Sequence, residues 1–302
     1  MIEKTAVNKQ NLYKPLYFYE SARAAFEDIL NKYPRSTLML PGYIGFSPKE
    51  GSGIYDPVVN SGINHVFYPI DKNLNINIEQ FGKVFSSIGG QKIVLLVHYF
   101  GYTDPHIADL VEICKTGNSV VIEDAAHGLY TDFIDHRCGQ YGDFVLYSLH
   151  KMLPFEGGGM LKINNVECEF EPKKKLTVYE SPFMYDLKTI ADKRKRNARL
   201  WNELLGKSSE VLSIMRPYSD SVTPQTFPII IKEYDRNDLY FKLNESGFGA
   251  VSLYHTMIEP IQNGDHDNAM WLSKHIINLP VHQDVNEDDI HEMAKQLLSI
   301  LG

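Results

Sequence analysis

Two short apolar runs in the middle of the chain, residues 120–122 and 144–147, lead directly into side chains that can do chemistry. A carboxylate, an imidazole, a hydroxyl and an amine follow them: Asp124, His127, Ser148 and Lys151. Carboxylates and imidazoles can move protons, and an unprotonated lysine amine is a nucleophile. The sequence therefore predicts a reactive crevice, provided that the fold brings the ends of the two runs together.

Continuous apolar runs rich in Val and Ile are typical of strands buried on both faces of a sheet. The N-terminal half alternates further expected strands with expected helices: strands at 37–40, 65–68 and 93–97, and helices at 21–32, 78–88 and 105–115. This alternation predicts parallel βαβ units. Ligands of such sheets bind beyond the carboxyl ends of the strands, where the four reactive side chains are expected.

A charged segment at residues 167–175 is interpreted as the link to a smaller domain. We expect a large domain over residues 15–165 and a smaller C-terminal α/β domain over residues 166–302. In the smaller domain, strands are expected at 226–231 and 250–253, and a closing helix at 286–301. The basic run at 193–197 is consistent with a nucleic-acid patch or a solvated helix face, and the acidic chain favours the second.

The bulk composition is typical of a soluble globular protein, with 302 residues, 43% hydrophobic and 23% charged. A formal charge of −8 argues against nucleic acid as a partner. The three cysteines are widely spaced, and the first residues lack the apolar run of a signal peptide. No stretch approaches the roughly 20 apolar residues of a membrane span. We therefore expect a cytoplasmic protein with neither a membrane nor a nucleic-acid partner.

Five segments share their letters with the motifs of one protein family: V-H-Y-F-G at 97–101, I-E-D-A-A-H at 122–127, G-D-F at 142–144, E-G-G-G-M at 156–160 and N-L-P-V-H at 278–282. Together they resemble the DegT/DnrJ/EryC1/StrS family, sugar aminotransferases that depend on pyridoxal 5'-phosphate (PLP). The resemblance extends from about residue 21 to the C-terminus. It implies the PLP-dependent transferase fold of type I, with a mainly parallel seven-stranded sheet in the large domain.

The resemblance also implies roles for the reactive side chains. Lys151 would hold the PLP aldehyde as a Schiff base, and Asp124 would keep the pyridine nitrogen protonated. Strand alternation would point Glu123 to the opposite face of the sheet. His127 matches the family's Gln or His, which contacts the ring or its phenolic oxygen.

The phosphate and ring contacts are implied in the same way. The donors expected at the phosphate are Ser148 and the start of the first helix: Ser21, Ala22 and Arg23. A helix N-terminus suits an anion because of its free N–H groups and its dipole. Either Tyr43 or Phe46 would cover the ring. Three histidines match family positions near the substrate: His98, His255 and His282. His150, next to Lys151, is a further candidate for contact with the substrate.

One departure from the family's pattern concerns the lysine. Ser148 precedes Lys151 by three residues, whereas typical members have five. The neighbouring His150 keeps a second possibility open, because one branch of the family, a deoxysugar dehydratase, has histidine in place of the lysine. We favour Lys151 over His150 because shortened members with an S-L-x-K-x-x-P pattern also resemble PLP binders.

Taken singly, the same residues have simpler interpretations. Asp124 could cap a turn, and His127 could be a satisfied core histidine. His266 lies between two aspartates, but no second cluster of ligands has suitable spacing, so no metal site is predicted. The glycines at 157–159 do not follow a strand and open a helix, which excludes a dinucleotide-binding loop.

The resemblance implies transamination from glutamate or glutamine to a nucleotide-linked keto sugar in the synthesis of surface polysaccharides or antibiotic sugars. It also implies a homodimer with sites at the interface. Two competing hypotheses are a PLP-dependent sugar dehydratase and a non-catalytic regulatory or scaffold member of the family.

Overall fold

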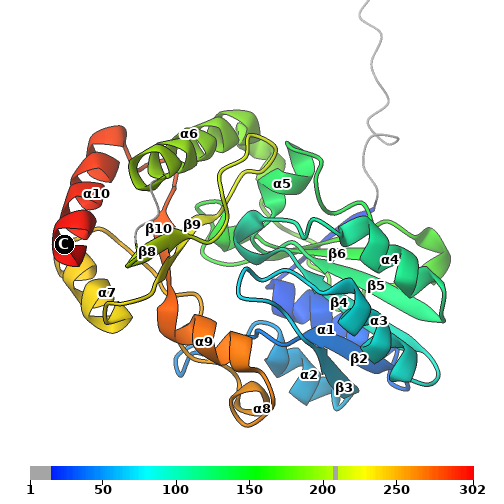
Figure 1. Cartoon of the computed structure of the whole chain (residues 1–302). Helices are drawn as coiled ribbons and strands as arrows, with labels where there is room; N and C mark the ends of the chain where they lie inside the picture. The colour runs from blue at the N-terminus through cyan, green and yellow to red at the C-terminus, as the bar shows by residue number, and fades with distance from the viewer. Residues whose placement is uncertain (1–14, 207–209) are drawn as a thin grey trace, which may run out of the picture.

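A computed structural model describes residues 15–206 and 210–302 of the chain. Its larger sheet has seven strands in the order β1-β7-β6-β5-β4-β2-β3. The five strands from β6 to β3 run parallel, whereas β7 and β1 are antiparallel to their neighbours. The mainly parallel seven-stranded sheet expected from the sequence is confirmed (Figure 1).

The strands of the large sheet are β1 (Leu16–Tyr19), β2 (Thr37–Pro41), β3 (Asn64–Tyr68), β4 (Lys92–Val97), β5 (Ser119–Asp124), β6 (Phe144–Ser148) and β7 (Gly159–Ile163). A second, three-stranded antiparallel sheet has the order β10-β9-β8. Its strands are β8 (Leu212–Ile214), β9 (Thr226–Ile231) and β10 (Ile276–Pro280). The strand expected at 226–231 therefore coincides with β9.

The helices are α1 (Ala22–Lys32), α2 (Tyr55–Ser61), α3 (Ile78–Ser87), α4 (Ile107–Lys115), α5 (Leu129–Phe133), α6 (Leu187–Leu205), α7 (Arg236–Glu245), α8 (Glu259–Gln262), α9 (Asp267–His275) and α10 (Glu287–Leu301). Asn and Asp side chains cap several helix starts, as at Asn77 and Asp235. In Figure 1, α6, α7 and α10 surround the small sheet, while α1 to α4 lie with the large one. No helix in the described parts of the chain has the length and apolar content to cross a bilayer.

The largest core lies around the strands of the large sheet, with fully buried side chains such as Leu38 and Ile93. A second core joins the small sheet to α6, α7 and α10, with Trp201 fully buried. Met257 and Ile258 come from the C-terminal half but belong to the first core. Side chains from beyond residue 165 thus pack into the core of the large sheet, and the domain boundary near that residue stays a prediction.

Two expectations were wrong. Residues 250–253 do not form a strand: Val251 makes only an isolated antiparallel bridge to Asn278, because the chain leaves the edge of β10 after one residue pair. Arg194 does not lie on a solvated helix face, since it is 1% exposed. Its Nη1 donates to the Gln225 carbonyl at 3.2 Å, and its Nε donates to Gln283 Oε1 at 3.1 Å.

Candidate active site

The two apolar runs of the sequence form adjacent parallel strands, β5 and β6. Asp124 is the last residue of β5, and Ser148 is the last residue of β6. A short 3-10 turn, Leu149–Lys151, follows β6 directly. Because parallel strands end at the same edge of a sheet, this connection brings the reactive side chains together beyond the carboxyl ends.

Lys151 points into this edge. Its Nζ lies 3.0 Å from Nε2 of His127. Burial lowers the pKa of the Lys151 amine, while the carboxylates of Asp124 and Glu50 act in the opposite direction and Arg23 adds to the lowering. The amine is thus closer to its unprotonated, nucleophilic form than an exposed lysine would be.

Asp124 lies close enough to Lys151 for the two charges to act on each other. Burial raises the pKa of the Asp124 carboxyl, and Lys151 opposes this rise whenever its amine is protonated. Oδ1 accepts a hydrogen bond from the Ala126 N–H at 2.9 Å, which fixes the carboxylate in place. Amine and carboxylate are therefore both held by their surroundings at one edge of the sheet.

Glu123, the neighbour of Asp124, is fully buried with a separate set of partners. Its carboxylate accepts hydrogen bonds from the backbone N–H groups of Gly139, Tyr141 and Gly142 at 2.6 to 2.8 Å. It also lies 2.9 Å from Nε2 of His98. These contacts explain a structural role that the sequence did not predict: Glu123 holds the 139–142 loop against the end of β4.

His127 is 5% exposed, and both ring nitrogens have partners. Nδ1 accepts a hydrogen bond from the Phe100 N–H at 3.1 Å, and Nε2 faces Lys151. The imidazole also lies nearly parallel to the Phe100 ring, at 14° and a centroid distance of 6.0 Å. Burial, with a smaller effect of Lys151, lowers the pKa of His127 well below its ordinary value, so the ring is neutral.

The start of α1 provides the donors expected for a phosphate. Ser21 caps the helix, and its Oγ accepts from the Ala24 N–H at 3.1 Å. The N–H groups of Ala22 and Arg23 lie in the first turn, where a helix offers no internal acceptor. A Cβ at Gly159 would lie 2.2 Å from the carbonyl carbon of Ser21, so only glycine allows β7 this close to the helix start.

The side chains of the other predicted phosphate ligands already have polar partners within the protein. Ser148 is buried, and its Oγ lies 3.4 Å from Nδ1 of the neighbouring His150. The Arg23 guanidinium donates to the Glu50 carbonyl at 2.8 Å and lies 3.3 Å from the Asp56 carboxylate. A phosphate would therefore have to share this guanidinium with the 50–56 loop.

Tyr43 is fully buried. Its hydroxyl donates to the Leu253 carbonyl at 2.9 Å and accepts from the Tyr254 N–H at 2.6 Å. It thus joins the loop after β2 to the 253–254 segment, while the other candidate, Phe46, is 40% exposed. Tyr254 was not predicted from the sequence, yet the Asp124 carboxylate is near enough to add to the effect of burial and raise its pKa.

The predicted substrate histidines do not lie together, and His282 is exposed beside Asp284. His98 is 2% exposed and is enclosed against Glu123. His150 and His255 are both exposed. The structure thus turns Lys151, and not His150, toward Asp124 and His127, which favours the lysine as the cofactor-binding residue.

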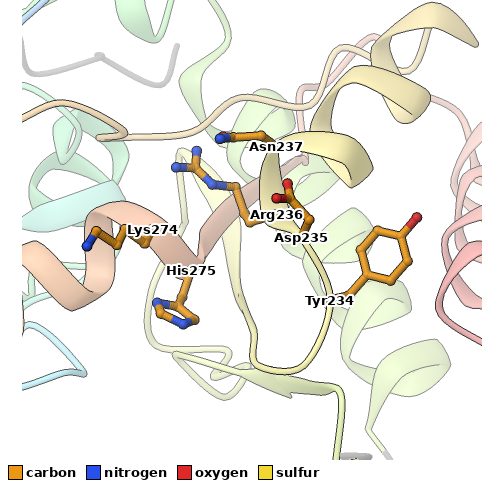
Figure 2. Close-up of a pocket in the computed structure, with 6 residues that line it drawn as sticks. All are labelled: Tyr234, Asp235, Arg236, Asn237, Lys274 and His275. Carbon is orange, nitrogen blue, oxygen red and sulfur yellow. The ribbon is translucent and has the colours of Figure 1, made fainter.

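A separate cavity of about 350 Å³ lies between the start of α7 and the end of α9 (Figure 2). None of its lining residues belongs to the group around Lys151, and the terminal nitrogens of Arg236 within it donate to Ser252 Oγ and the Ser273 carbonyl. In the described residues, no group of three or more His, Cys, Asp or Glu side chains could hold a metal ion.

The residues gathered beyond β5 and β6 fit PLP on three observations. An amine of lowered pKa lies near a half-buried carboxylate, so one group could hold an aldehyde and the other a ring nitrogen. A neutral imidazole lies beside the amine. The glycine of β7 leaves room for the N–H groups of α1 to approach a phosphate.

The fold is that of the PLP-dependent transferases of type I. An aminotransferase of the DegT DnrJ EryC1 StrS type from Brucella abortus has a TM-score of 0.77, 18% identity, and coverage of 97% of this chain and 88% of that one. The sequence model of the DegT/DnrJ/EryC1/StrS aminotransferase family matches residues 53–174 and 183–298, and the chain belongs to this family. It is accordingly a PLP-dependent aminotransferase by class.

Among curated proteins, the chain is 21% identical over 305 residues to the spore coat polysaccharide biosynthesis protein SpsC of Bacillus subtilis, covering 84% of this chain and 78% of the relative. It is 22% identical over 244 residues to the UDP-4-amino-4,6-dideoxy-N-acetyl-beta-L-altrosamine transaminase of Campylobacter jejuni, covering 67% and 64%. A GDP-4-keto-6-deoxymannose-3-dehydratase structure (ColD) has a TM-score of 0.73 and 17% identity, covering 96% and 89%.

Proposed function

We propose that the protein moves an amino group from glutamate or glutamine to a keto sugar carried on a nucleotide, with Lys151 as the amine that holds the PLP aldehyde. The observation that carries this proposal is the meeting of the Lys151 amine, the Asp124 carboxylate and His127 beyond β5 and β6. The Campylobacter jejuni relative, a UDP-sugar transaminase by name, supports the nucleotide-linked acceptor. SpsC supports a setting in polysaccharide synthesis.

Bound PLP would supply an electron sink that makes the carbon next to the amino group acidic. Asp124 would hold a proton on the ring nitrogen. The Lys151 amine would be the base that takes and returns the proton of the donor's carbon. The N–H groups of Ala22 and Arg23, together with Ser148, would bind the phosphate.

The partners follow from this assignment. They are a small amino donor and a sugar acceptor, and we place the reaction in the cytoplasm, where PLP, glutamate and nucleotide sugars occur together. A homodimer belongs to the same proposal. Exposed side chains of the 178–184 segment, among them Val178 and Met184 at 87% and 75% exposure, supply apolar surface that a second subunit could cover.

A dehydratase is the second candidate, because ColD shares the fold and His150 lies next to Lys151. The exposure of His150 argues against it, since a histidine replacing the lysine as the reacting base must face the ring. In the dehydratase case, Lys151 would not hold the aldehyde, and the amino donor would not be consumed in proportion to the product.

The test is the visible absorption of the full-length protein mixed with PLP. We expect an absorption band that is lost in Lys151→Ala, persists in His150→Ala, and disappears when glutamate is added to the wild type. A band that survives Lys151→Ala would overturn the assignment of the lysine. If that surviving band is also indifferent to glutamate and glutamine, the dehydratase is favoured instead.

A further inference from the structure

The contact between His127 and Lys151 determines which of their nitrogen atoms carry protons, because Nδ1 of the imidazole already accepts a hydrogen bond. The Phe100 N–H donates to Nδ1, so Nδ1 must present a lone pair. A neutral imidazole carries a single N–H, which must then be on Nε2. The ring is neutral because its burial opposes protonation. The Nε2–H group therefore points at whatever lies 3.0 Å away, which is Nζ of Lys151.

An ammonium group has three donors and no lone pair. If Lys151 were protonated, its N–H groups would face the N–H of His127, donor against donor. The unprotonated amine instead offers a lone pair that accepts the hydrogen bond. We propose that His127 donates its Nε2–H to the free amine of Lys151 and thereby holds this lysine unprotonated in the cofactor-free protein, ready to attack a carbonyl carbon.

The charged groups around Lys151 act in both directions. Asp124 at the end of β5 and Glu50 in the loop before α2 favour the ammonium form, whereas Arg23 on α1 disfavours it. His150, in the same turn, is itself driven toward the neutral form by burial and by Lys151. The hydrogen bond from His127 lowers the pKa of the Lys151 amine, as burial and Arg23 also do. Together, these three effects oppose the two carboxylates, which raise it.

The protonation state of Lys151 does not depend on the cofactor. Only the role of its free amine, attack on a carbonyl carbon, rests on the proposed function. The backbone fixes the geometry: the Phe100 carbonyl accepts from the Gln225 N–H at 2.7 Å, while the N–H of the same residue holds His127. His127 is thus a positioning residue whose tautomer is imposed by a peptide group rather than by another side chain.

The test measures the pKa of the Lys151 amine in the full-length protein freed of cofactor. Acetic anhydride acetylates only the unprotonated amine, with release of acetate and a proton, so the labelling rate of each lysine against pH gives its titration by mass spectrometry. The exposed Lys193 is the internal reference. The variants are His127→Leu, which removes the donor, and His127→Gln, whose amide can accept from Phe100 and still donate to Lys151.

We expect Lys151 in His127→Gln to titrate close to the wild type. In His127→Leu its pKa should rise by about one unit, which moves the midpoint of the labelling curve to higher pH by the same amount. Leucine is less polar than histidine, so changed solvation alone would lower the pKa; a rise can only report the lost donor. An unchanged or lower pKa in the leucine variant would overturn the proposal.

Nitrogen NMR of His127 supplies a second measurement that does not depend on the leucine variant folding. The wild type should show the tautomer with hydrogen on Nε2 at neutral pH, and a ring with hydrogen on Nδ1 would be incompatible with the proposal. If the pKa rise and the Nε2–H tautomer are both observed but glutamate is never consumed, the proposed transamination is wrong and the role of His127 still holds.

Discussion

Asp124 is a residue whose surroundings oppose its own charge. Burial raises the pKa of its carboxyl, and Lys151 offsets this only in part. If His127 keeps Lys151 unprotonated, the carboxylate lacks a full counter-charge until a protonated ring nitrogen arrives. Charged groups in unfavourable surroundings are common at active sites, where they lower the stability of the fold but serve the reaction.

The first prediction is that Asp124→Asn makes the cofactor-free protein more stable at pH 7. A raised native pKa means that the folded state binds the proton more tightly than the unfolded chain, whose pKa is about 3.9. The carboxylate therefore costs stability above its native pKa, and this cost vanishes as the pH falls below the unfolded pKa. Urea unfolding at pH 7 and pH 4 should show a gain at pH 7 that shrinks at pH 4.

The same variant should lose activity, by about 100-fold or more, because the ring nitrogen loses its charged partner. Glu112→Gln, on the exposed face of α4, is the control for simple removal of a charge. If Asp124→Asn destabilises the protein at pH 7 or leaves turnover intact, the carboxylate does not have the role assigned here.

At the scale of elements, the site depends on how closely β7 approaches the start of α1. Gly158 N–H donates to the Glu20 carbonyl at 2.9 Å, and Gly159 pairs with Ser148 across the sheet. The run of glycines therefore joins the start of α1, where we propose that phosphate binds, to the strand that leads to Lys151. This explains why the E-G-G-G-M motif belongs to the site although none of its side chains reacts.

Gly159→Ala tests that connection. Its Cβ would lie 2.3 Å from the Ala22 N, a backbone atom that can move only if α1 moves. We expect a loss of about 1–3 kcal/mol in the free energy of unfolding, together with weaker binding of PLP. Gly89→Ala, where a Cβ meets nothing within 4 Å, is the matched control. Equal effects of the two substitutions on PLP binding would show that the helix start does not hold the phosphate.

At the scale of the whole molecule, the central strands could be predicted because strands buried on both faces have continuous apolar sequences. The edge strand β1 was missed, since Leu16–Tyr19 is stabilised by pairing with β7, a partner distant in sequence. The buried Arg194 could have been found: it falls between Ala191 and Ala198 on the apolar stripe of α6. Tyr254 could not, because only the packing of the two halves brings it toward Asp124.

The two halves of the chain also meet at Gly101, which follows the Phe100 peptide that holds His127. Gly101 has φ of +91°, and a Cβ there would lie 2.9 Å from the Thr223 carbonyl and 3.0 Å from the His127 carbonyl. Thr131 Oγ1 donates to the carbonyls of both Gly101 and Thr223, at 2.8 and 3.2 Å. The segment before β9 is thus packed directly on the turn that orients the imidazole.

Gly101→Ala should therefore disturb catalysis from outside the crevice. Gly247 is the matched control: its φ of +84° is similar, but a Cβ there meets nothing within 4 Å. Both alanines bear the cost of a left-handed backbone, so the difference between them isolates the contact between the halves. We expect Gly101→Ala to be less stable than Gly247→Ala by about 1–3 kcal/mol, and the pKa of its Lys151 amine to rise because His127 is displaced. If the amine titrates alike in both variants, the packing of the halves does not control the proton on Lys151, and His127 is oriented by the 125–128 segment alone.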